Sequence, residues 1–415
     1  MYTEVHRSRR VRAIAGSVAA IVLVVMGGAC SGSSSADEST GTARSAATST
    51  MVALFTGSDE AFYETPDPLP EGKPGELIRV MKVGTTPKTE TLKVMYHSRD
   101  AHRLDRPATA MITYPTAKAP AGGWPVLATS PGTVGLDAHC GVSHFQKAAP
   151  AWGLGDDEVV RVETDYIGLG PTDQPLHAYL SKPSEGHSVL DAIRAARQIP
   201  EVHAGADFLS VGHSQGGHGA LSASQIAADY AAELHLLGTV ALAPAAMLDK
   251  IYGGIDPIVT SVLTSMVLYG AASEHPDVDV DDYVTPELAE ASKVFRTGCL
   301  EEITNDLVPL VVEAKMFKTD PRTAPDAKSL IAENEVAGHR VDTPLYLAGG
   351  TNDDRVVEQR VRDLYASLCE AGQVTEFRIF GGADHGSILT ESAPDVKAFL
   401  EARLAGDKPV DSCDT

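Results

Sequence analysis

Residues 208–217 read Phe-Leu-Ser-Val-Gly-His-Ser-Gln-Gly-Gly. The apolar run at 208–212 predicts a buried β-strand, and residues 220–232 after the glycines favour a helix. Between them lies a Gly-x-Ser-x-Gly turn centred on Ser214. On a tight turn from strand to helix the serine hydroxyl stands exposed, and the flanking glycines allow close approaches that a Cβ would block. The turn therefore predicts that Ser214 is a nucleophile at one edge of a sheet.

Short apolar stretches recur on both sides of this turn. Three of them predict an antiparallel meander, at 77–83, 92–98 and 108–114. Five more are continuous apolar runs, typical of strands covered on both faces, at 125–129, 159–163, 237–242, 344–348 and 375–380. Helical patterns lie between them, at 184–198, 355–371 and 394–405. This alternation predicts an α/β fold with a mostly parallel sheet flanked by helices.

One connection is far too long for a simple loop. About 100 residues separate the predicted strand that ends at 242 from the one that begins at 344. Helical patterns occupy 258–269, 286–294 and 301–317, and the first of these is unusually apolar and carries no charge. We predict a core domain formed by residues 67–244 and 340–413, with residues 245–339 inserted as a helical cap.

Composition and charge exclude several classes of protein. The chain has 34 Lys and Arg but 56 Asp and Glu, a formal net charge of −22 over 415 residues. A phosphate backbone recruits basic side chains, so we expect no nucleic-acid partner. Residues 277–288 begin like a calcium loop but have Asp282 where glycine is needed and Leu288 where glutamate is needed. We expect no metal and no cofactor, and the sequence makes no prediction of oligomeric state.

The N-terminus has the pattern of an export signal. Four arginines at 7–12 precede an apolar run at 13–26 and the small residues Gly-Gly-Ala before Cys30. We predict that residues 1–30 are a signal peptide. The residues around Cys30 resemble the lipobox of bacterial lipoproteins, whose cysteine is lipidated, but Gly27 stands where that pattern prefers an aliphatic residue. The protein is therefore either a cell-surface lipoprotein anchored through Cys30 or freely secreted. Residues 31–60 begin with a run rich in Ser, Thr, Ala and Gly and predict a disordered tether.

A serine nucleophile needs a histidine base and a carboxylate that orients it. Around such a turn the acid and then the histidine follow the serine in the chain. His385 lies just beyond the last predicted strand, so we expect it to be the base. For the acid, Gly-x-x-Asp-x-x-Val counted from Gly350 favours Asp353 over its neighbour Asp354, and Asp384 is a third candidate.

Backbone donors must also hold the oxyanion of the tetrahedral intermediate. The N–H of Gln215, next to the serine, is the first candidate. The second comes from the loop Ser130-Pro-Gly-Thr-Val134, in which Gly132 permits close approach and Thr133 supplies the donor. The alternative is an ordinary Pro-Gly turn without a catalytic role.

Several blocks together resemble the secretory lipase (lipase A-like) family of α/β-hydrolases. The blocks are Gly-His-Ser214-Gln-Gly-Gly, Asp165-Tyr-Ile-Gly-Leu-Gly, His177-Ala-Tyr-Leu and residues 189–196, with the Asp353 and His385 loops. This resemblance implies an exported α/β-hydrolase with a helical cap above the serine. Four cysteines remain after Cys30 and allow three pairings. The resemblance implies the pairs Cys140 with Cys299 and Cys369 with Cys413.

The sequence therefore predicts a serine carboxylester hydrolase, a lipase or esterase whose substrates are acylglycerols or other small-molecule or lipid esters. The apolar segment 258–269 either lines an acyl pocket or is simply buried core. Two alternatives stay open. The same three residues serve acyltransferases and peptidases, and a surface protein can keep this scaffold for binding alone.

Overall fold

The computed structural model describes residues 52–145, 148–250, 256–323 and 327–413. The predicted signal peptide, Cys30 and the tether up to residue 51 lie outside the described residues. None of the helices formed by the described residues is long and apolar enough to cross a membrane.

Among the described residues, nine strands form one sheet in the order β1-β2-β3-β5-β4-β6-β7-β8-β9. The first three pair antiparallel, β3 pairs antiparallel with β5, and every later pairing is parallel. The predicted α/β fold with a mostly parallel sheet is thus confirmed. The bounds are β1 Leu77–Thr85, β2 Thr89–Arg99, β3 Asp105–Pro115, β4 Trp124–Ser130, β5 Val160–Thr164, β6 Ala204–His213, β7 His235–Leu242, β8 Leu345–Gly350 and β9 Thr375–Phe380.

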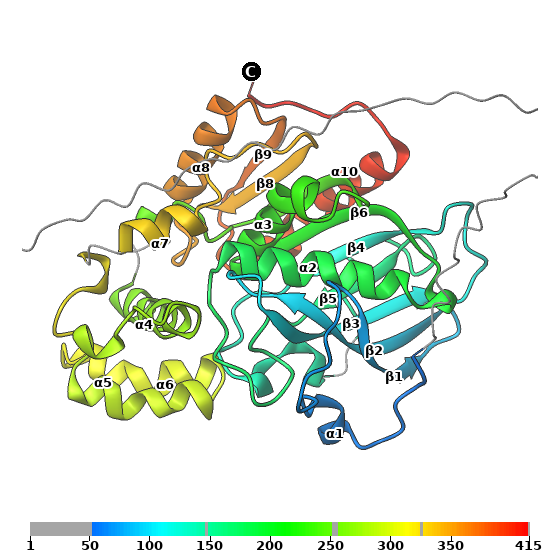
Figure 1. Ribbon diagram of the computed structural model, residues 1–415. Coiled ribbons are helices and arrows are strands. Elements are labelled where there is room, and N and C mark those ends of the chain that lie inside the picture. The colour runs from blue at the N-terminus through cyan, green and yellow to red at the C-terminus, as the bar shows by residue number, and fades with distance from the viewer. Residues whose placement is uncertain (1–51, 146–147, 251–255, 324–326, 414–415) are drawn as a thin grey trace, which may run out of the picture. The chain divides into compact units, whose positions relative to one another are not determined.

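Helices cover both faces of this sheet. In Figure 1, α2 (Lys182–Arg197) and α3 (Gln215–Tyr230) lie across one face. Phe208 of β6 packs in the cluster that contains α2, whereas its neighbour Leu209 packs with α10 (Ala393–Ala405) on the opposite face. Successive residues of one strand are therefore both buried, which is why β6 reads as a continuous apolar run. The helix α8 (Glu358–Glu370) packs beside β8 and β9.

Helices fill the long connection between β7 and β8. They are α4 (Pro257–Glu274), α5 (Pro286–Ala291), α6 (Leu300–Val312) and α7 (Ala327–Asn334). Their apolar side chains form a cluster of their own around Met266, Phe295 and Leu307. The disulfide between Cys140 and Cys299 joins the start of α6 to the core, as the family resemblance implied. We call residues 245–339 the cap.

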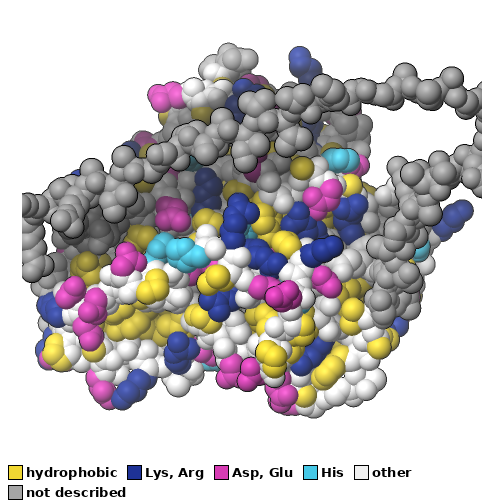
Figure 2. All heavy atoms as spheres, viewed as in Figure 1, with side chains coloured by type: hydrophobic (Ala, Val, Ile, Leu, Met, Phe, Trp, Pro, Cys, Tyr) yellow, Lys and Arg dark blue, Asp and Glu magenta, His cyan; other side chains and the backbone are white. Residues whose placement is uncertain are grey.

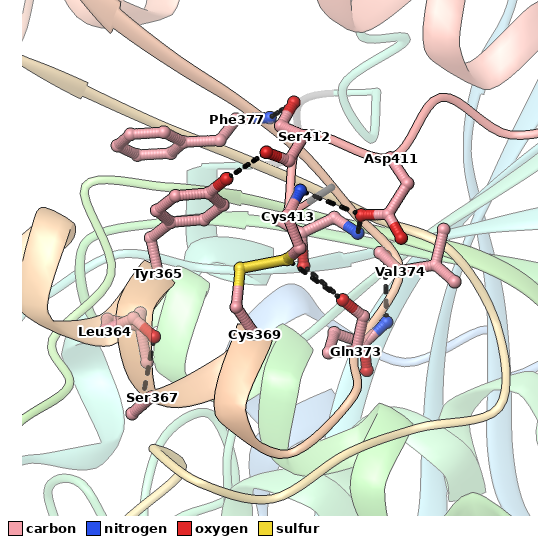
Figure 3. Close-up of a disulfide and its surroundings, with 11 residues drawn as sticks. Leu364, Tyr365, Ser367, Cys369, Gln373, Val374, Phe377, Asp411, Ser412 and Cys413 are labelled. Carbon is pink, nitrogen blue, oxygen red and sulfur yellow. Dashed lines mark hydrogen bonds between the residues drawn. A yellow bond between two sulfur atoms is a disulfide. The ribbon is translucent and has the colours of Figure 1, made fainter. Parts of the chain in front are cut away.

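The second disulfide ties the C-terminus to the sheet edge (Figure 3). It joins Cys369 at the end of α8 to Cys413, again the expected pair. Beside it, the backbone N–H of Ser412 donates to the carbonyl of Thr375 at 2.8 Å, and the Tyr365 hydroxyl donates to the Ser412 carbonyl at 2.5 Å. The tail thus supplies partners to the edge strand β9, whose backbone groups would otherwise be open to another chain.

The described residues begin inside the segment that the sequence assigned to a disordered tether. Leu54 forms a bridge with Val80 of β1, and α1 (Asp59–Tyr63) follows directly. Phe62 and Tyr63 are fully buried, and Lys93, also buried, pairs with Asp59. Leu54 and Asp59 thus contact the sheet from within the predicted tether, so the prediction of a disordered segment up to residue 60 was wrong for its last residues.

Charged side chains of both signs are interspersed with hydrophobic ones on the face drawn in Figure 2. On that face the excess of acidic residues is therefore not gathered into a single patch.

Candidate active site

The serine turn has the strained geometry that its sequence predicts. The strand β6 ends at His213 and α3 begins at Gln215, which leaves Ser214 alone between them with φ 61° and ψ −123°. A Cβ on Gly212 would lie 1.9 Å from the carbonyl oxygen of Gly216, and a Cβ on Gly216 would lie 2.1 Å from that of Ser130. Both glycines are therefore required, and the turn holds the Ser214 hydroxyl at the carboxyl end of the sheet.

Three residues that are far apart in the sequence meet at this point. The Ser214 hydroxyl donates to Nε2 of His385 at 3.0 Å, and Nδ1–H of His385 donates to Oδ2 of Asp353 at 2.9 Å. The carboxylate thereby fixes the tautomer in which Nε2 is free to accept the serine proton. This is the geometry of a nucleophile, a base and an orienting acid.

The Asp353 carboxylate is held on both oxygens. Its Oδ1 accepts the backbone N–H groups of Arg355 and Val356, each at 2.8 Å, while Oδ2 accepts from His385. Burial raises the pKa of Asp353. The hydrogen bond from His385, the positive charge of that imidazole and the two backbone donors outweigh burial and lower the pKa of Asp353 below its usual value. The side chain is therefore ionised wherever the imidazole can act as a base.

The other candidate acids point elsewhere. Asp354 is exposed and lies before the start of α8 at Glu358. The Asp384 carboxylate accepts the backbone N–H groups of Gly386 and Ser387 and shapes the loop that carries His385. Asp353 is thus the carboxylate that the described structure brings to the histidine.

Two of the three predicted oxyanion residues line a cavity that Ser214 also lines. The N–H of Gln215 belongs to the first turn of α3, so no carbonyl within the helix accepts it. Gly132 and Thr133 line the cavity together with Ser214. A Cβ on Gly132 would lie an ordinary 3.6 Å from its nearest neighbour, so close packing does not require glycine there. The Thr133 hydroxyl hydrogen-bonds to the hydroxyl of Tyr179 at 2.9 Å.

A buried polar network holds the side chain of Gln215. Its Nε2 donates to Oε1 of Glu185 at 2.7 Å and to Nε2 of His177 at 2.8 Å. His218 donates from Nδ1 to Oε2 of Glu185 at 2.6 Å and from Nε2 to the carbonyl of Asn334 at 2.8 Å. Burial lowers the pKa of His218, but Glu185 and these acceptors raise it above its usual value. The result is a buried ion pair beneath the serine turn that also contacts the cap.

This network is the part of the site that the sequence did not reveal. Glu185 drew no prediction, because a glutamate in the first turn of a helix ordinarily faces solvent. The block that contains His177 and Tyr179 was noted for the family resemblance alone. A second group of interest, His139 beside Cys140 and Cys299, offers no metal site because both sulfurs are in the disulfide.

The cavity above the serine has a volume of about 540 Å³. Its core side carries His213, Arg355 and Arg360 beside Ser214 and His385. The cap supplies the apolar side chains of Val259, Val262 and Leu263 from α4, while α6 adds Leu300 and three polar residues, Glu301, Thr304 and Asn305. The site therefore has the hydrogen-bonded Ser214 and His385 on its core side and the apolar side chains of α4 on its cap side.

The matching family model is that of the secretory lipases, which covers residues 156–412. The chain belongs to the secretory lipase family. Secreted triacylglycerol lipase LIP5 of Malassezia globosa is 25% identical over 256 residues, 58% of this chain and 53% of that lipase. The chain thus spans about half the length of this relative. Secreted triacylglycerol lipase LIP7 of the same fungus is 22% identical over 86% of this chain and 81% of its own length.

The fold of this secretory lipase is also that of solved lipases. The X-ray structure of Candida antarctica lipase A superposes with a TM-score of 0.71, covering 86% of this chain and 88% of that one at 18% identity. At this identity the likeness establishes the shared α/β-hydrolase fold.

Proposed function

We propose that this secretory lipase is a serine carboxylester hydrolase that cleaves acylglycerols or other carboxylic esters through an acyl-enzyme. The observation that carries the proposal is the chain of hydrogen bonds from Ser214 through His385 to Asp353, at 3.0 and 2.9 Å. In support, the two Malassezia relatives are named as triacylglycerol lipases.

The reaction follows from these contacts. His385 accepts the proton of Ser214 as the oxygen attacks the ester carbonyl, and Asp353 stabilises the imidazolium that forms. The N–H groups of Gln215 and Thr133 hold the oxyanion. His385 then returns the proton to the leaving alcohol, and a water molecule activated in the same way releases the acid.

The apolar wall of the cavity supports an acyl chain as the substrate group that lies against the cap. Val259, Val262 and Leu263 face the cavity from α4, the helix formed by the apolar segment that the sequence singled out. An alkyl chain covered by these side chains leaves water at about 0.8 kcal/mol per CH₂. We therefore expect activity to rise with acyl length until the chain exceeds the cavity.

The experiment is a p-nitrophenyl ester series from acetate to palmitate on the purified protein and its Ser214→Ala variant. The expected result is hydrolysis by the wild type and its loss, by a factor of about 10⁴ or more, in the variant. Ser222→Ala is the matched control, because that hydroxyl is buried in α3 and forms no hydrogen bond within the described residues. Equal hydrolysis by Ser214→Ala and the wild type would contradict the mechanism.

Two alternatives are separated by further measurements. Peptide substrates and the detection of acylated alcohols test for a peptidase or an acyltransferase. Failure of a fluorophosphonate probe to label Ser214 would indicate a binding protein on a hydrolase scaffold. The arrangement of Ser214, Asp353 and His385 favours catalysis, because binding alone does not need a base aligned with a hydroxyl.

We also propose that the protein is exported, as the relatives named secreted suggest, and anchored to the membrane through a lipid on Cys30. Metabolic labelling with a palmitate analogue tests the anchor. Labelling that is lost in Cys30→Ala is the expected result, and an unlabelled protein in the culture medium would contradict it.

A further inference from the structure

A second cavity, of about 360 Å³, lies beside the catalytic cavity and shares two of its lining residues, Gly132 and His213. Trp152 and Glu163 line its other side, and residues from α9 (Ile388–Glu391) and α10 close it. At the roughly 30 Å³ that one water occupies in the liquid, it has room for about ten non-hydrogen atoms. This is the size of a small alcohol and not of a long acyl chain.

Strand register places this second cavity at the end of the sheet where ligands bind. Glu163 of β5 pairs with Thr129 of β4, which in turn pairs with Val211 of β6, two residues before His213. Neighbouring strands lie about 4.8 Å apart, so Glu163 and His213 project from strands only about 10 Å apart. Both residues stand at the carboxyl ends of their strands, beside Ser214.

Two polar groups of the second cavity have no partner among the described residues. No hydrogen bond or ion pair to the Glu163 carboxyl is formed by the described residues, and Nε2 of His213 is buried without a hydrogen-bond partner among them. Nε2 of His213 is an unpaired buried group, and its cost in free energy is recovered when a ligand supplies the missing hydrogen bond. The half-buried Glu163 carboxyl offers the ligand a second polar partner. An alcohol with hydroxyl groups of its own pairs with both, whereas an alkyl group leaves both unpaired.

The charge state of these groups favours a neutral ligand. Burial, with the Asp165 carboxyl as a smaller cause, raises the pKa of Glu163 to about 8, so at neutral pH this carboxyl is mainly protonated. Burial and the neighbouring His385 lower the pKa of His213 to about 4, so its ring is neutral. A protonated carboxyl and a neutral imidazole each donate and accept hydrogen bonds, as does a hydroxyl.

The second cavity also lies where the alcohol part of an ester must be. The leaving oxygen receives its proton from Nε2 of His385, and the ring of His213 packs against that imidazole with centroids 4.5 Å apart. The acyl chain lies on the other side, against Leu263 and the rest of the cap wall. The acyl part of an ester thus lies in the catalytic cavity and its alcohol part in the second cavity, on the two sides of the bond that is broken.

We propose that the cavity between Trp152, Glu163 and His213 binds the alcohol part of the substrate, and that this part is a polyol with free hydroxyls, as in a monoacylglycerol. The inference rests on the proposed ester hydrolysis and adds a preference to it. A triacylglycerol or a methyl ester presents no free hydroxyl to Glu163, so the enzyme works faster on monoacylglycerols than on either.

The test compares 1-monooctanoylglycerol with methyl octanoate, which share an acyl chain, by the ratio of their kcat/KM values. The wild type favours the glycerol ester, and Glu163→Leu lowers the ratio about three- to tenfold, the effect of one hydrogen bond. Glu163→Gln keeps most of the ratio because its amide still donates and accepts. Glu376→Leu is the matched control, since it removes another half-buried glutamate, from β9, outside both cavities.

Three results overturn the proposal: an unchanged ratio in Glu163→Leu, a wild-type ratio near one, or a preference for octanoylcholine, whose cationic alcohol needs an ionised carboxylate. If the wild type hydrolyses neither octanoate ester, the proposed ester hydrolysis itself fails. If it hydrolyses methyl octanoate without preferring the glycerol ester, only the alcohol site fails.

A second measurement needs no variant, in case Glu163→Leu does not fold. The acyl-enzyme formed from p-nitrophenyl octanoate is offered glycerol or 1-propanol. The alcohol oxygen adds to the acyl carbonyl while His385 takes its proton, and the bond to Ser214 then breaks as the serine oxygen regains a proton. The alcohol site predicts faster transfer to glycerol than to 1-propanol at equal concentration, and the reverse order overturns it.

Discussion

Replacing Asp353 by asparagine tests the arrangement of the site most directly. Three donors surround this carboxylate: the backbone N–H groups of Arg355 and Val356 on one oxygen, and Nδ1–H of His385 on the other. An asparagine has a single oxygen. If that oxygen keeps the two backbone donors, the amide NH₂ faces His385, and two hydrogens then oppose each other.

The imidazole relieves this opposition by moving its proton from Nδ1 to Nε2. It then accepts from the asparagine NH₂, but Nε2 carries a hydrogen and no longer accepts the proton of Ser214. The wrong tautomer of a triad histidine costs about 10⁴-fold in kcat, or about 5 kcal/mol of transition-state stabilisation. We expect a loss of this size in Asp353→Asn with little change in KM.

The assay is kcat and KM for a p-nitrophenyl ester, with circular dichroism to show that each variant is folded. Asp354→Asn is the matched control, because its exposed carboxyl adjoins Asp353 in the chain. We expect less than a twofold effect there. A loss below tenfold in Asp353→Asn, or an equal loss in both variants, would refute the argument from the three donors.

Three further predictions concern stability. The unfolded chain releases the Glu163 proton near pH 4.5 but the folded protein keeps it until about pH 8, so the folded state loses stability as the pH rises through this interval. Glu163→Gln should therefore raise Tm relative to the wild type at about pH 9 but not below about pH 4. An equal change in Tm at both pH values would contradict this. Replacing Cys369 and Cys413 by alanine opens a loop of sequence separation 44 and should lower the free energy of unfolding, measured by urea titration, by at most about 4 kcal/mol. Ester hydrolysis should persist, because this disulfide lies away from Ser214. Loss of hydrolysis in a variant that is still folded would contradict this prediction. His218→Gln leaves the buried Glu185 charge uncompensated and should cost roughly 3–5 kcal/mol, measured in the same way, and a cost below about 1 kcal/mol would mean that the pair is not ionised.

The sheet could be predicted because its strands are buried on both faces. Phe208 and Leu209 pack on opposite sides of β6, so successive residues of the strand are apolar. Such a continuous apolar run can be recognised in the sequence. The start of α3 could not be predicted in the same way. Glycines at 216, 217 and 219 lower the helix propensity of its first turn, so the sequence placed the helix at 220 and not at Gln215.

Tertiary contacts explain why a weak helix former occupies that turn. A Cβ on Gly216 would meet the Ser130 carbonyl, and a Cβ on Gly219 would meet the Tyr166 hydroxyl at 2.4 Å. The glycines that lower the helix propensity of this turn are therefore the ones that let α3 pack beside Ser130 and Tyr166. Likewise, Glu185 and His218 lie 33 residues apart and are buried only because each supplies the other's partner. Such a pair leaves no local pattern.

The helix α4 shows how an ambiguous pattern was resolved by its surroundings. The sequence left open whether its apolar segment lines an acyl pocket or is simply buried, because a helix that is apolar on all sides lacks the polar stripe that marks a surface. In the structure Val262 and Leu263 line the catalytic cavity. One turn further along α4, Met266 is buried in the core of the cap. Val267 and Leu268 line another, mainly apolar cavity.

Both interpretations therefore describe the same helix at successive turns. A charged residue anywhere on its inner turns would either enter a cavity or lose its hydration in the cap core, at a cost of several kcal/mol if unpaired. The many apolar residues of α4 and the lack of charge over 258–269 are thus a consequence of apolar surroundings that change from turn to turn. For the proposed hydrolysis this means that acyl-chain selectivity is set at the first turns, by Val259, Val262 and Leu263, while the later turns hold the cap together.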